Sequence, residues 1–461
     1  MGLHGDTAHG ACTLYEASPL TGRWQAGPIA EMNDTTRMLR HGQVWKVDRA
    51  VIEHHLAHFT EPGYEAAYAI ATWPGNGDPL FGEPALLAPF IDANGNGVYE
   101  PDLGEYPAIR GDQAVFRTMN ELTPSPDEIP ILPMGVEMQI MQSEFLSSWI
   151  EHLHNMVLTN IKIINRSANQ YDDVRLGIFM DPDVGGYDDD LVGCDPELDL
   201  AFAYNSSSFD GPSLGALGYG EHPPAVGCAF LNSHLLSHVT FERISPNSQI
   251  TDPSTVAECW RVLNGQFADG DPVLTPTGDT TTFIYYGDPN TPGDWTMPLP
   301  TPATVDVRTI SATGPFTLAP GDTLCVDLAF VFAQDSAGDN LSSVALLKDH
   351  VAQVREWYQQ QNVQCNGSYG LVTDVISGSK LPPLLIHPNP AQDHVTITGP
   401  SSPGPVHLSI LDARGQQVMS RDQRMTGGSA TVTTDGLTNG LYLVKVQSAG
   451  IVSYGRLVIA R

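Results

Sequence analysis

Basic residues are scarce in this sequence. Its 461 residues include 22 lysines and arginines against 53 aspartates and glutamates, which gives a formal net charge of −31. Nucleic acids and anionic membranes are both bound through lysine and arginine. The sequence therefore predicts no nucleic-acid partner and no anionic membrane surface, whereas an excess of carboxylates is often used to bind cations.

Long apolar runs and paired cysteine motifs are also missing. No stretch of about 18 apolar residues occurs, which predicts no transmembrane segment. The 6 cysteines are dispersed and form no C-x-x-C motif, which argues against a zinc ribbon or a dithiol redox site. Cys194 and Cys228 are a candidate disulfide pair, with buried free thiols as the alternative.

Glycine and proline, by contrast, are abundant. With 44 glycines, 36 prolines and only 16% charged residues, the composition favours a loop-rich, mostly β protein. Alternating apolar residues predict neighbouring strands at 156–165 and 174–180, and later strands at 282–286 and 325–332. We expect a β-sandwich body, closed by one helix over about 340–361, where apolar residues recur at steps of three and four behind a capping Asp339.

The first candidate metal site is the segment 92–103. Asp92, Asn94 and Asn96 occupy positions 1, 3 and 5 of a calcium-type loop, and Gly97 falls where the sharp turn is needed. Val98 would contribute its main-chain carbonyl. Leu103 replaces the usual closing glutamate, so Glu100 or Asp102 must close the site, and we place Asp102 among the predicted Ca²⁺ ligands.

The second candidate metal site is the acidic loop predicted over 181–199. Asp181, Asp183, Asp188 and Asp189 crowd into nine residues and would raise one another's pKa unless a cation lay between them. We predict Ca²⁺ with these four aspartates as ligands. A catalytic carboxylate pair of the glycosidase type, and a solvated acidic loop, remain as alternatives.

The last eighty or so residues read as a separate small all-β domain. Pro388-Asn389-Pro390 precedes short alternating segments, and Asp412-Ala413-Arg414-Gly415 supplies a turn in the middle. The segment Gly440-Leu441-Tyr442-Leu443-Val444-Lys445-Val446 forms a later strand, and the chain ends on Arg461.

Together these features resemble the type A C-terminal sorting domain of proteins exported by the type IX secretion system (Por secretion) of certain Gram-negative bacteria. The resemblance implies a small Ig-like β-sandwich at 381–461, contact with the type IX secretion machinery, and a secreted or outer-cell-surface location. Such proteins carry a signal peptide, which the sequence from Met1 lacks, so we expect the start to be truncated.

The body resembles uncharacterised exported proteins that carry the same tail. The shared features are the 92–102 loop, Gly104-Glu105-Tyr106-Pro107 and the aspartate series that ends at Tyr204-Asn205, with Glu105 standing where aspartate is usual. Because that family has no assigned activity, the resemblance implies no mechanism.

The predicted organisation has four parts: an N-terminal region 1–130, a β-sandwich body 131–365, a glycine- and serine-rich linker 366–380, and the sorting domain 381–461. Two functions fit it. The first is a non-catalytic, calcium-stabilised β-sandwich in adhesion, envelope structure or ligand binding, with a glycan or a surface protein as ligand. The alternative is a secreted hydrolase of polysaccharide or protein, although no His, Ser, Cys or Glu arrangement is specific for one.

Overall fold

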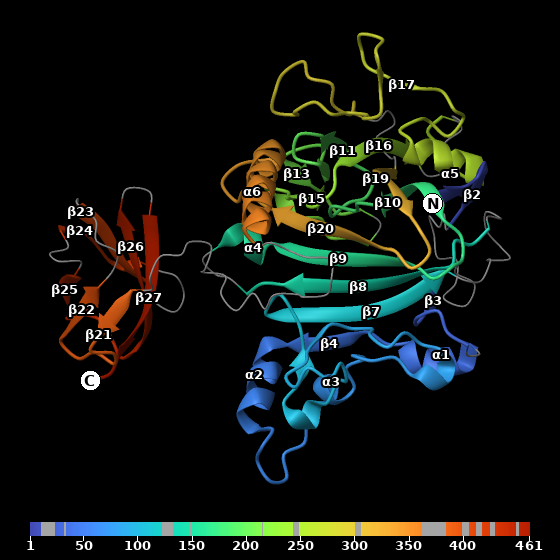
Figure 1. The fold of residues 1–461 in the computed structure, drawn as a ribbon. Helices are drawn as coiled ribbons and strands as arrows, with labels where there is room; N and C mark the ends of the chain where they lie inside the picture. The colour runs from blue at the N-terminus through green and yellow to red at the C-terminus, as the bar shows by residue number, and fades with distance from the viewer. Residues whose placement is uncertain are drawn as a thin grey trace. The chain divides into compact units, whose positions relative to one another are not determined.

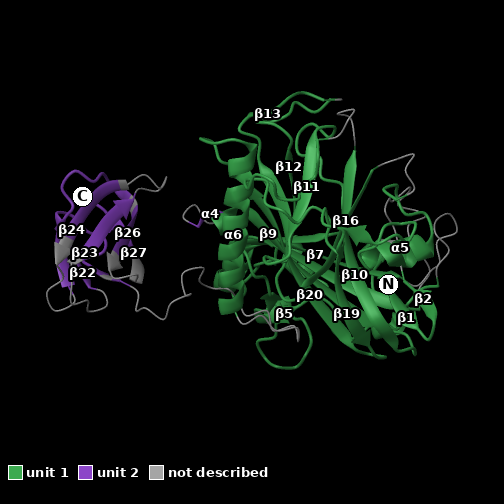
Figure 2. Ribbon diagram, turned by 90° about the horizontal axis from the view of Figure 1, so that it is seen from above, with its two compact units in different colours: residues 1–146, 152–371 green, residues 147–151, 372–461 purple. Residues whose placement is uncertain are grey.

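The protein is described here from a computed structural model. The structure describes residues 1–10, 24–31, 34–121, 132–146, 150–213, 215–242, 249–299, 306–361, 384–398, 405–411, 417–424, 429–448 and 451–461. It divides into two compact units, a body of residues 1–146 and 152–371 and a C-terminal unit of residues 147–151 and 372–461 (Figure 2). The predicted linker 366–380 and the turn at 412–415 lie outside the described residues.

The body is built on two antiparallel sheets, and the predicted mostly β fold is confirmed (Figure 1). The larger, nine-stranded sheet has the order β11-β12-β15-β20-β9-β8-β7-β3, with β4 paired to β7. Its strands are β3 (Gln25–Ala26), β4 (Trp45–Asp48), β7 (Gln113–Glu121), β8 (Val136–Glu144), β9 (Met156–Asn165), β11 (Asp190–Asp195), β12 (Leu200–Asn205), β15 (Ala225–Phe230) and β20 (Thr323–Ala333).

The second sheet has five strands in the order β16-β19-β10-β1-β2. They are β1 (Gly2–His4), β2 (Thr7–His9), β10 (Tyr171–Met180), β16 (Leu235–Glu242) and β19 (Val307–Leu318). Three small two-stranded sheets complete the body: β5 (Phe90–Ile91) with β6 (Tyr106–Pro107), β13 (Phe209–Asp210) with β14 (Gly220–Glu221), and β17 (Val273–Leu274) with β18 (Thr280–Thr281).

The main core lies between the two large sheets. Alternate residues of the nine-stranded sheet, such as Ile161 and Ile163 of β9, meet Val174 of β10 and Leu318 of β19. Because side chains alternate between the faces of a strand, each sheet also has an outer face to bury.

Helices cover those outer faces. α6 (Asn340–Gln360) packs on β20, β15 and β12, and its buried Val344, Leu347 and Val351 follow the predicted spacing. Asp339 caps it by accepting N–H bonds from Leu341 and Ser342. The other helices are α1 (Asp34–His41), α2 (Arg49–His58), α3 (Tyr68–Ala71), α4 (Glu151–His154), α5 (Val256–Leu263), η1 (Pro79–Phe81) and η2 (Pro101–Leu103). α5 packs on the five-stranded sheet, and α2 and α3 pack near β4 (Figure 1).

Three details differ from the sequence-based predictions. The strand at 174–180 does not neighbour 156–165, because β10 pairs with β19 and β1 in the other sheet. Residues 282–286 do not form a strand, since Tyr285 has a φ of 55° and Phe283 makes an isolated bridge with His238. The acidic segment 181–199 is not all loop, because its apolar stretch from Leu191 to Cys194 lies in β11.

The N-terminal region predicted over 1–130 does not form a unit of its own. Its β1 belongs to the five-stranded sheet, and its β7 lies within the nine-stranded sheet beside β8. Long-range strand pairing of this kind leaves no mark in local sequence patterns.

The C-terminal unit contains two small sheets around one core. One sheet holds β21 (Leu385–His387), β22 (His394–Thr398) and β25 (Ser429–Thr433), and the other holds β23 (Pro405–Leu411), β24 (Gln417–Arg424), β26 (Gly440–Ser448) and β27 (Ile451–Ile459). Val395 and Ile397 of the first sheet are buried with Leu408 and Val444 of the second. The predicted strand that starts at Gly440 is confirmed.

Candidate metal sites and ligand pocket

The loop that follows β5 folds around the carboxylate of Asp92. Its oxygens accept main-chain N–H bonds from Gly95 at 2.7 Å, Asn96 at 3.3 Å and Gly97 at 2.7 Å. These donors, Gly97 above all, hold the pKa of Asp92 below its usual range. Gly95 and Gly97 have φ values of 75° and 77°, so both positions favour glycine.

Further oxygen-bearing side chains converge on the same loop. Asn94 and Asn96 donate their amides to Glu100 Oε2 at 3.0 and 2.6 Å. Glu105 is fully buried, accepts the N–H of Glu100 at 2.8 Å, and hydrogen-bonds the Asp92 carboxyl. Two carboxyl groups can approach each other only if a proton or a cation lies between them.

The structure thus brings Asp92, Asn94 and Asn96 together with Glu100 and Glu105. Val98 is exposed and donates its N–H to Asn96 Oδ1 at 2.7 Å. Asp102 lies exposed on η2, and its charge acts on His55, where it opposes the lowering of the His55 pKa by burial. The sequence did not predict that Glu105 lies at the Asp92 loop. The pairing of β5 with β6 returns Glu105 to Asp92, and these two-residue strands are too short to recognise in the sequence.

The aspartates predicted as a second site fall into two clusters. The first, which we call the Arg308 cluster, surrounds a guanidinium on β19 that is only 1% exposed. Its nitrogens lie 3.3 Å from Asp181, 3.0 Å from Asp252 and 3.1 Å from Asp306. Burial, followed by the charge of Asp306, raises the pKa of Asp183.

One guanidinium does not neutralise this many carboxylates. Burial, followed by the charges of Asp306 and Asp183, raises the pKa of Asp181 to about 7. Asp181 nevertheless lies beside Arg308, a cation that the chain itself supplies.

The second group, which we call the Asp190 cluster, comprises Asp189, Asp190, Asn205 and Asp210. Asp190 opens β11 and pairs directly with Asn205 across the β11–β12 ladder. Asp190 Oδ2 accepts the N–H of Val184 at 2.8 Å, and Asp210 accepts the N–H groups of Gly186 at 3.1 Å and Tyr219 at 2.7 Å.

The negative charges of the carboxylates in the Asp190 cluster repel one another. Burial, together with the charges of Asp189 and Asp210, raises the pKa of Asp190 to about 9. Burial also raises the pKa of Asp189, with Asp210 and the predicted ligand Asp188 adding to the effect. Among the described residues, no Lys, Arg or His forms an ion pair with these carboxylates, whereas nearby Asp195 pairs with Lys348 at 3.0 Å.

Metal binding at any of these places needs more than carboxylates. In the described part of the chain, no three His, Cys, Asp or Glu side chains lie close enough together to bind one ion. A calcium site would therefore draw on amide, main-chain and water oxygens, which Ca²⁺ accepts readily.

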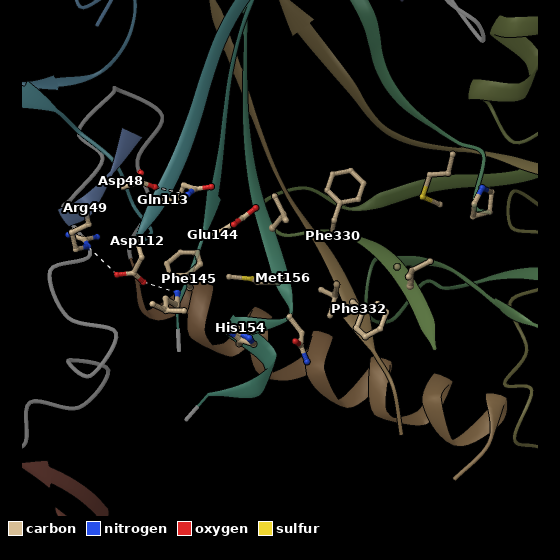
Figure 3. A pocket seen from close by; sticks show the side chains of 18 of the residues that line it. Asp48, Arg49, Asp112, Gln113, Glu144, Phe145, His154, Met156, Phe330 and Phe332 are labelled. Carbon is tan, nitrogen blue, oxygen red and sulfur yellow. Dashed lines mark hydrogen bonds and ion pairs between the residues drawn. The ribbon is translucent and has the colours of Figure 1, made fainter. Parts of the chain in front are cut away.

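A cavity of about 900 Å³ opens at one end of the sandwich (Figure 3). Phe330 and Phe332 of β20 and Met156 of β9 line it, while Glu144 and His154 add polar groups. On one side Arg49 pairs with Asp112 at 3.4 Å, and Gln113 donates to Asp48 at 2.6 Å. The pocket therefore combines an apolar lining with a mainly acidic rim.

The predicted pairing of Cys194 with Cys228 is wrong. Both are free thiols in the main core, and burial raises their pKa, to about 12 for Cys228. They lie on different strands, β11 and β15, that are separated by β12. Cys259 and Cys325 are each in a disulfide.

The C-terminal unit defines the class of protein. Residues 385–460 match the family model of the secretion system C-terminal sorting domain, as the Pro-Asn-Pro and glycine-led strand features predicted. The chain is therefore a secreted or cell-surface protein of the type IX secretion system. No helix in the described ranges is long and apolar enough to cross a membrane.

Comparisons of the whole chain are much weaker. No curated protein matches it. A polysaccharide lyase aligns with a TM-score of 0.21 at 7% identity, over 70% of this chain and 34% of its own. The BSP domain of a biofilm-associated protein aligns with a TM-score of 0.16 at 9% identity, over 76% of this chain and 60% of its own. This chain therefore spans about a third and three fifths of those two chains, and scores this low carry no argument.

Proposed function

We propose that the body is a non-catalytic, calcium-stabilised β-sandwich that acts at the cell surface or in the secreted fraction, in adhesion, envelope structure or ligand binding. Its ligand would be a glycan or a surface protein, held in the pocket beside Phe330 and Glu144. The C-terminal unit delivers it by contact with the type IX secretion machinery.

The observation that carries the calcium part of this proposal is the Asp92 loop. Main-chain N–H groups fix the Asp92 carboxylate, and the buried Glu105 carboxyl is held against it. A hard divalent cation bound by these oxygens and the two asparagine amides would remove the repulsion between the carboxylates and tie β5 to β6.

Thermal unfolding of the full chain in millimolar calcium and in excess chelator tests this. Binding to the native state alone stabilises it by about 2.7 kcal/mol at a hundredfold excess over Kd, so we expect a higher midpoint in calcium. Glu105→Gln keeps the hydrogen-bonding shape but removes one charge, so its calcium-dependent shift should be smaller. A wild-type thermal midpoint that is the same in calcium and in chelator would reject the proposal that calcium stabilises the body.

The pocket separates the binding function from the hydrolase alternative. We expect the wild type to bind immobilised glycans or surface proteins without product release, and Phe330→Ala to weaken that binding. Turnover of a polysaccharide or protein that Glu144→Gln abolishes would instead favour the hydrolase. Glu53→Gln, at the acidic rim of the same pocket, is the matched control.

A further inference from the structure

We propose that the Asp190 cluster holds a second Ca²⁺ site, in which the unpaired oxygens of Asp190 and Asn205 bind the ion together with Asp189 and with main-chain or water oxygens. The proposal deepens the proposed function by naming a site distinct from the Asp92 loop. It also separates these residues from Asp181, which Arg308 already accompanies.

Two buried oxygens without hydrogen-bond partners point to a missing ligand. Asp190 is 2% exposed and Asn205 is fully buried, yet Asp190 Oδ1 and Asn205 Oδ1 accept no hydrogen bond. The Asn205 amide nitrogen already donates to the carbonyl of Ser207 at 2.9 Å, so its oxygen is the atom left over. Buried polar atoms in folded proteins nearly always have a hydrogen-bond or metal partner, so two unpaired oxygens at one place need an explanation.

These oxygens share one place with the remaining carboxylates. Asp190 and Asn205 are directly opposite on paired strands, so their side chains lie on one face of the sheet. One loop bonds two of the carboxylates, because the N–H of Val184 reaches Asp190 and the N–H of Gly186 reaches Asp210, and the Asp189 and Asp210 charges both act on Asp190. The N–H groups of Val184, Gly186 and Tyr219 bond other oxygens of the cluster, but no group of the described residues donates to Asp190 Oδ1 or to Asn205 Oδ1.

The surrounding chain is shaped to the Asp210 carboxylate. A Cβ built on Gly185 would lie 1.7 Å from Asp210 Oδ2, so only glycine lets the 184–186 loop pass so closely. The N–H of Gly186 reaches the other oxygen of the same carboxylate. This loop, β11, β12 and β13 thus meet at the proposed site, and Asn340 at the start of α6 donates to the Asn205 carbonyl at 2.8 Å.

Calcium fits this set better than other cations. Ca²⁺ takes about six to eight oxygen ligands in flexible geometry, mixing carboxylates, amide oxygens, carbonyls and water, whereas Mg²⁺ demands near-octahedral geometry and keeps more of its water. Zinc prefers His and Cys ligands, which the cluster lacks. A proton shared between Asp190 and Asn205 is the rival explanation.

Calorimetric titration of Ca²⁺ into the full chain, freed of metal with a chelator, tests the site. We expect Asp189→Asn and Asp190→Asn each to bind one Ca²⁺ equivalent fewer than the wild type, and Asp181→Asn to bind as many. Asp189 is the more exposed of the two, so its variant keeps the test valid if Asp190→Asn does not fold.

This experiment can reject either proposed site independently of the other. Glu105→Gln reports on the Asp92 loop alone, so unchanged binding there, with a loss in Asp189→Asn, rejects only the first site. Full calcium binding by folded Asp189→Asn, or loss of an equivalent in Asp181→Asn, would overturn the second. Stability that varies with pH but not with calcium would assign the cluster to a shared proton and overturn it as well.

Discussion

The acidic segment 181–199 contributes Asp181 to the Arg308 cluster and Asp189 and Asp190 to the Asp190 cluster, yet the charge of the two clusters is balanced differently. Arg308 reaches three carboxylates from a single buried side chain. Asp190 instead faces other carboxylates and an amide oxygen that has no donor. Aspartates that are close in sequence can therefore differ in how their charge is balanced, because the fold brings a guanidinium to some of them and only other oxygens to the rest.

Removal of the built-in cation should have the largest effect. Arg308→Gln leaves Asp181, Asp252 and Asp306 without their guanidinium, and loss of one partner of a buried ion pair costs about 3–5 kcal/mol. Urea denaturation should show this loss both in calcium and in chelator. Arg49→Gln is the control, because its pair with Asp112 is partly exposed and should be worth less than about 1 kcal/mol.

Neutralisation of one aspartate in each cluster should give effects of different sign. In chelator, Asp190→Asn should stabilise the fold by about 1 kcal/mol, since its amide can donate to Asn205 Oδ1 and needs neither a proton nor a cation to do so. In calcium the same change should destabilise it. Asp306→Asn should destabilise by about 1–2 kcal/mol in both conditions, because it removes a partner of Arg308. If calcium changed the free energy of unfolding of both variants equally, the proposed difference between the two clusters would be wrong.

Acid sharpens the comparison, because it protonates carboxylates in both clusters and, once the chain unfolds, the otherwise fully buried His238. Burial lowers the pKa of His238 to about 3, so the folded state keeps it neutral. Between its ordinary pKa near 6.5 and that value, the unfolded chain binds the extra proton, and stability present above about pH 6.5 is lost as pH falls. The slope is at most about 1.4 kcal/mol per pH unit.

His238→Gln isolates this contribution, since glutamine can still bond Ser311, whose Oγ lies 2.9 Å from His238 Nδ1. Denaturation at a series of pH values should give a curve for the variant that falls less steeply below pH 6.5 than that of the wild type. Parallel curves would mean that His238 is protonated inside the fold.

The smallest effect is expected at Asp102. Asp102→Asn changes an exposed residue of η2, and such surface substitutions usually stay within about 0.5 kcal/mol. Its calcium-dependent shift in thermal midpoint should match that of the wild type, in contrast to Glu105→Gln. A large loss of the shift in Asp102→Asn would return Asp102 to the ligand set that its spacing predicted.

Local patterns in the sequence carried the predictions that succeeded. The strand at 156–165, the helix over about 340–361 and the sorting domain depend on alternation, on spacing of three and four residues, and on turn residues, all of which are short-range. The turn around Asp92 could be placed for the same reason, because Asp92, Asn94 and Asn96 follow one another at fixed intervals, whereas calcium binding there stays a prediction.

Contacts between distant segments could not be predicted. Arg308 reaches Asp181 because β10 pairs with β19, and Asp210 meets Asp190 through a hairpin and a loop that local patterns do not specify. Glu105 returns to Asp92 through strands of two residues. The sequence therefore predicted some residues of each cluster. It could not predict which positive group lies beside each carboxylate, because that depends on the tertiary fold.

The most direct test of the account is a crystal structure of the full chain grown in calcium, with anomalous scattering used to locate the ions. We predict one calcium peak within the Asp92 loop, close to Glu105, and another between Asp189, Asp190 and Asn205, with none beside Arg308. A calcium ion bound by Asp181 at the Arg308 cluster, or no ion at the Asp190 cluster, would contradict the division proposed here.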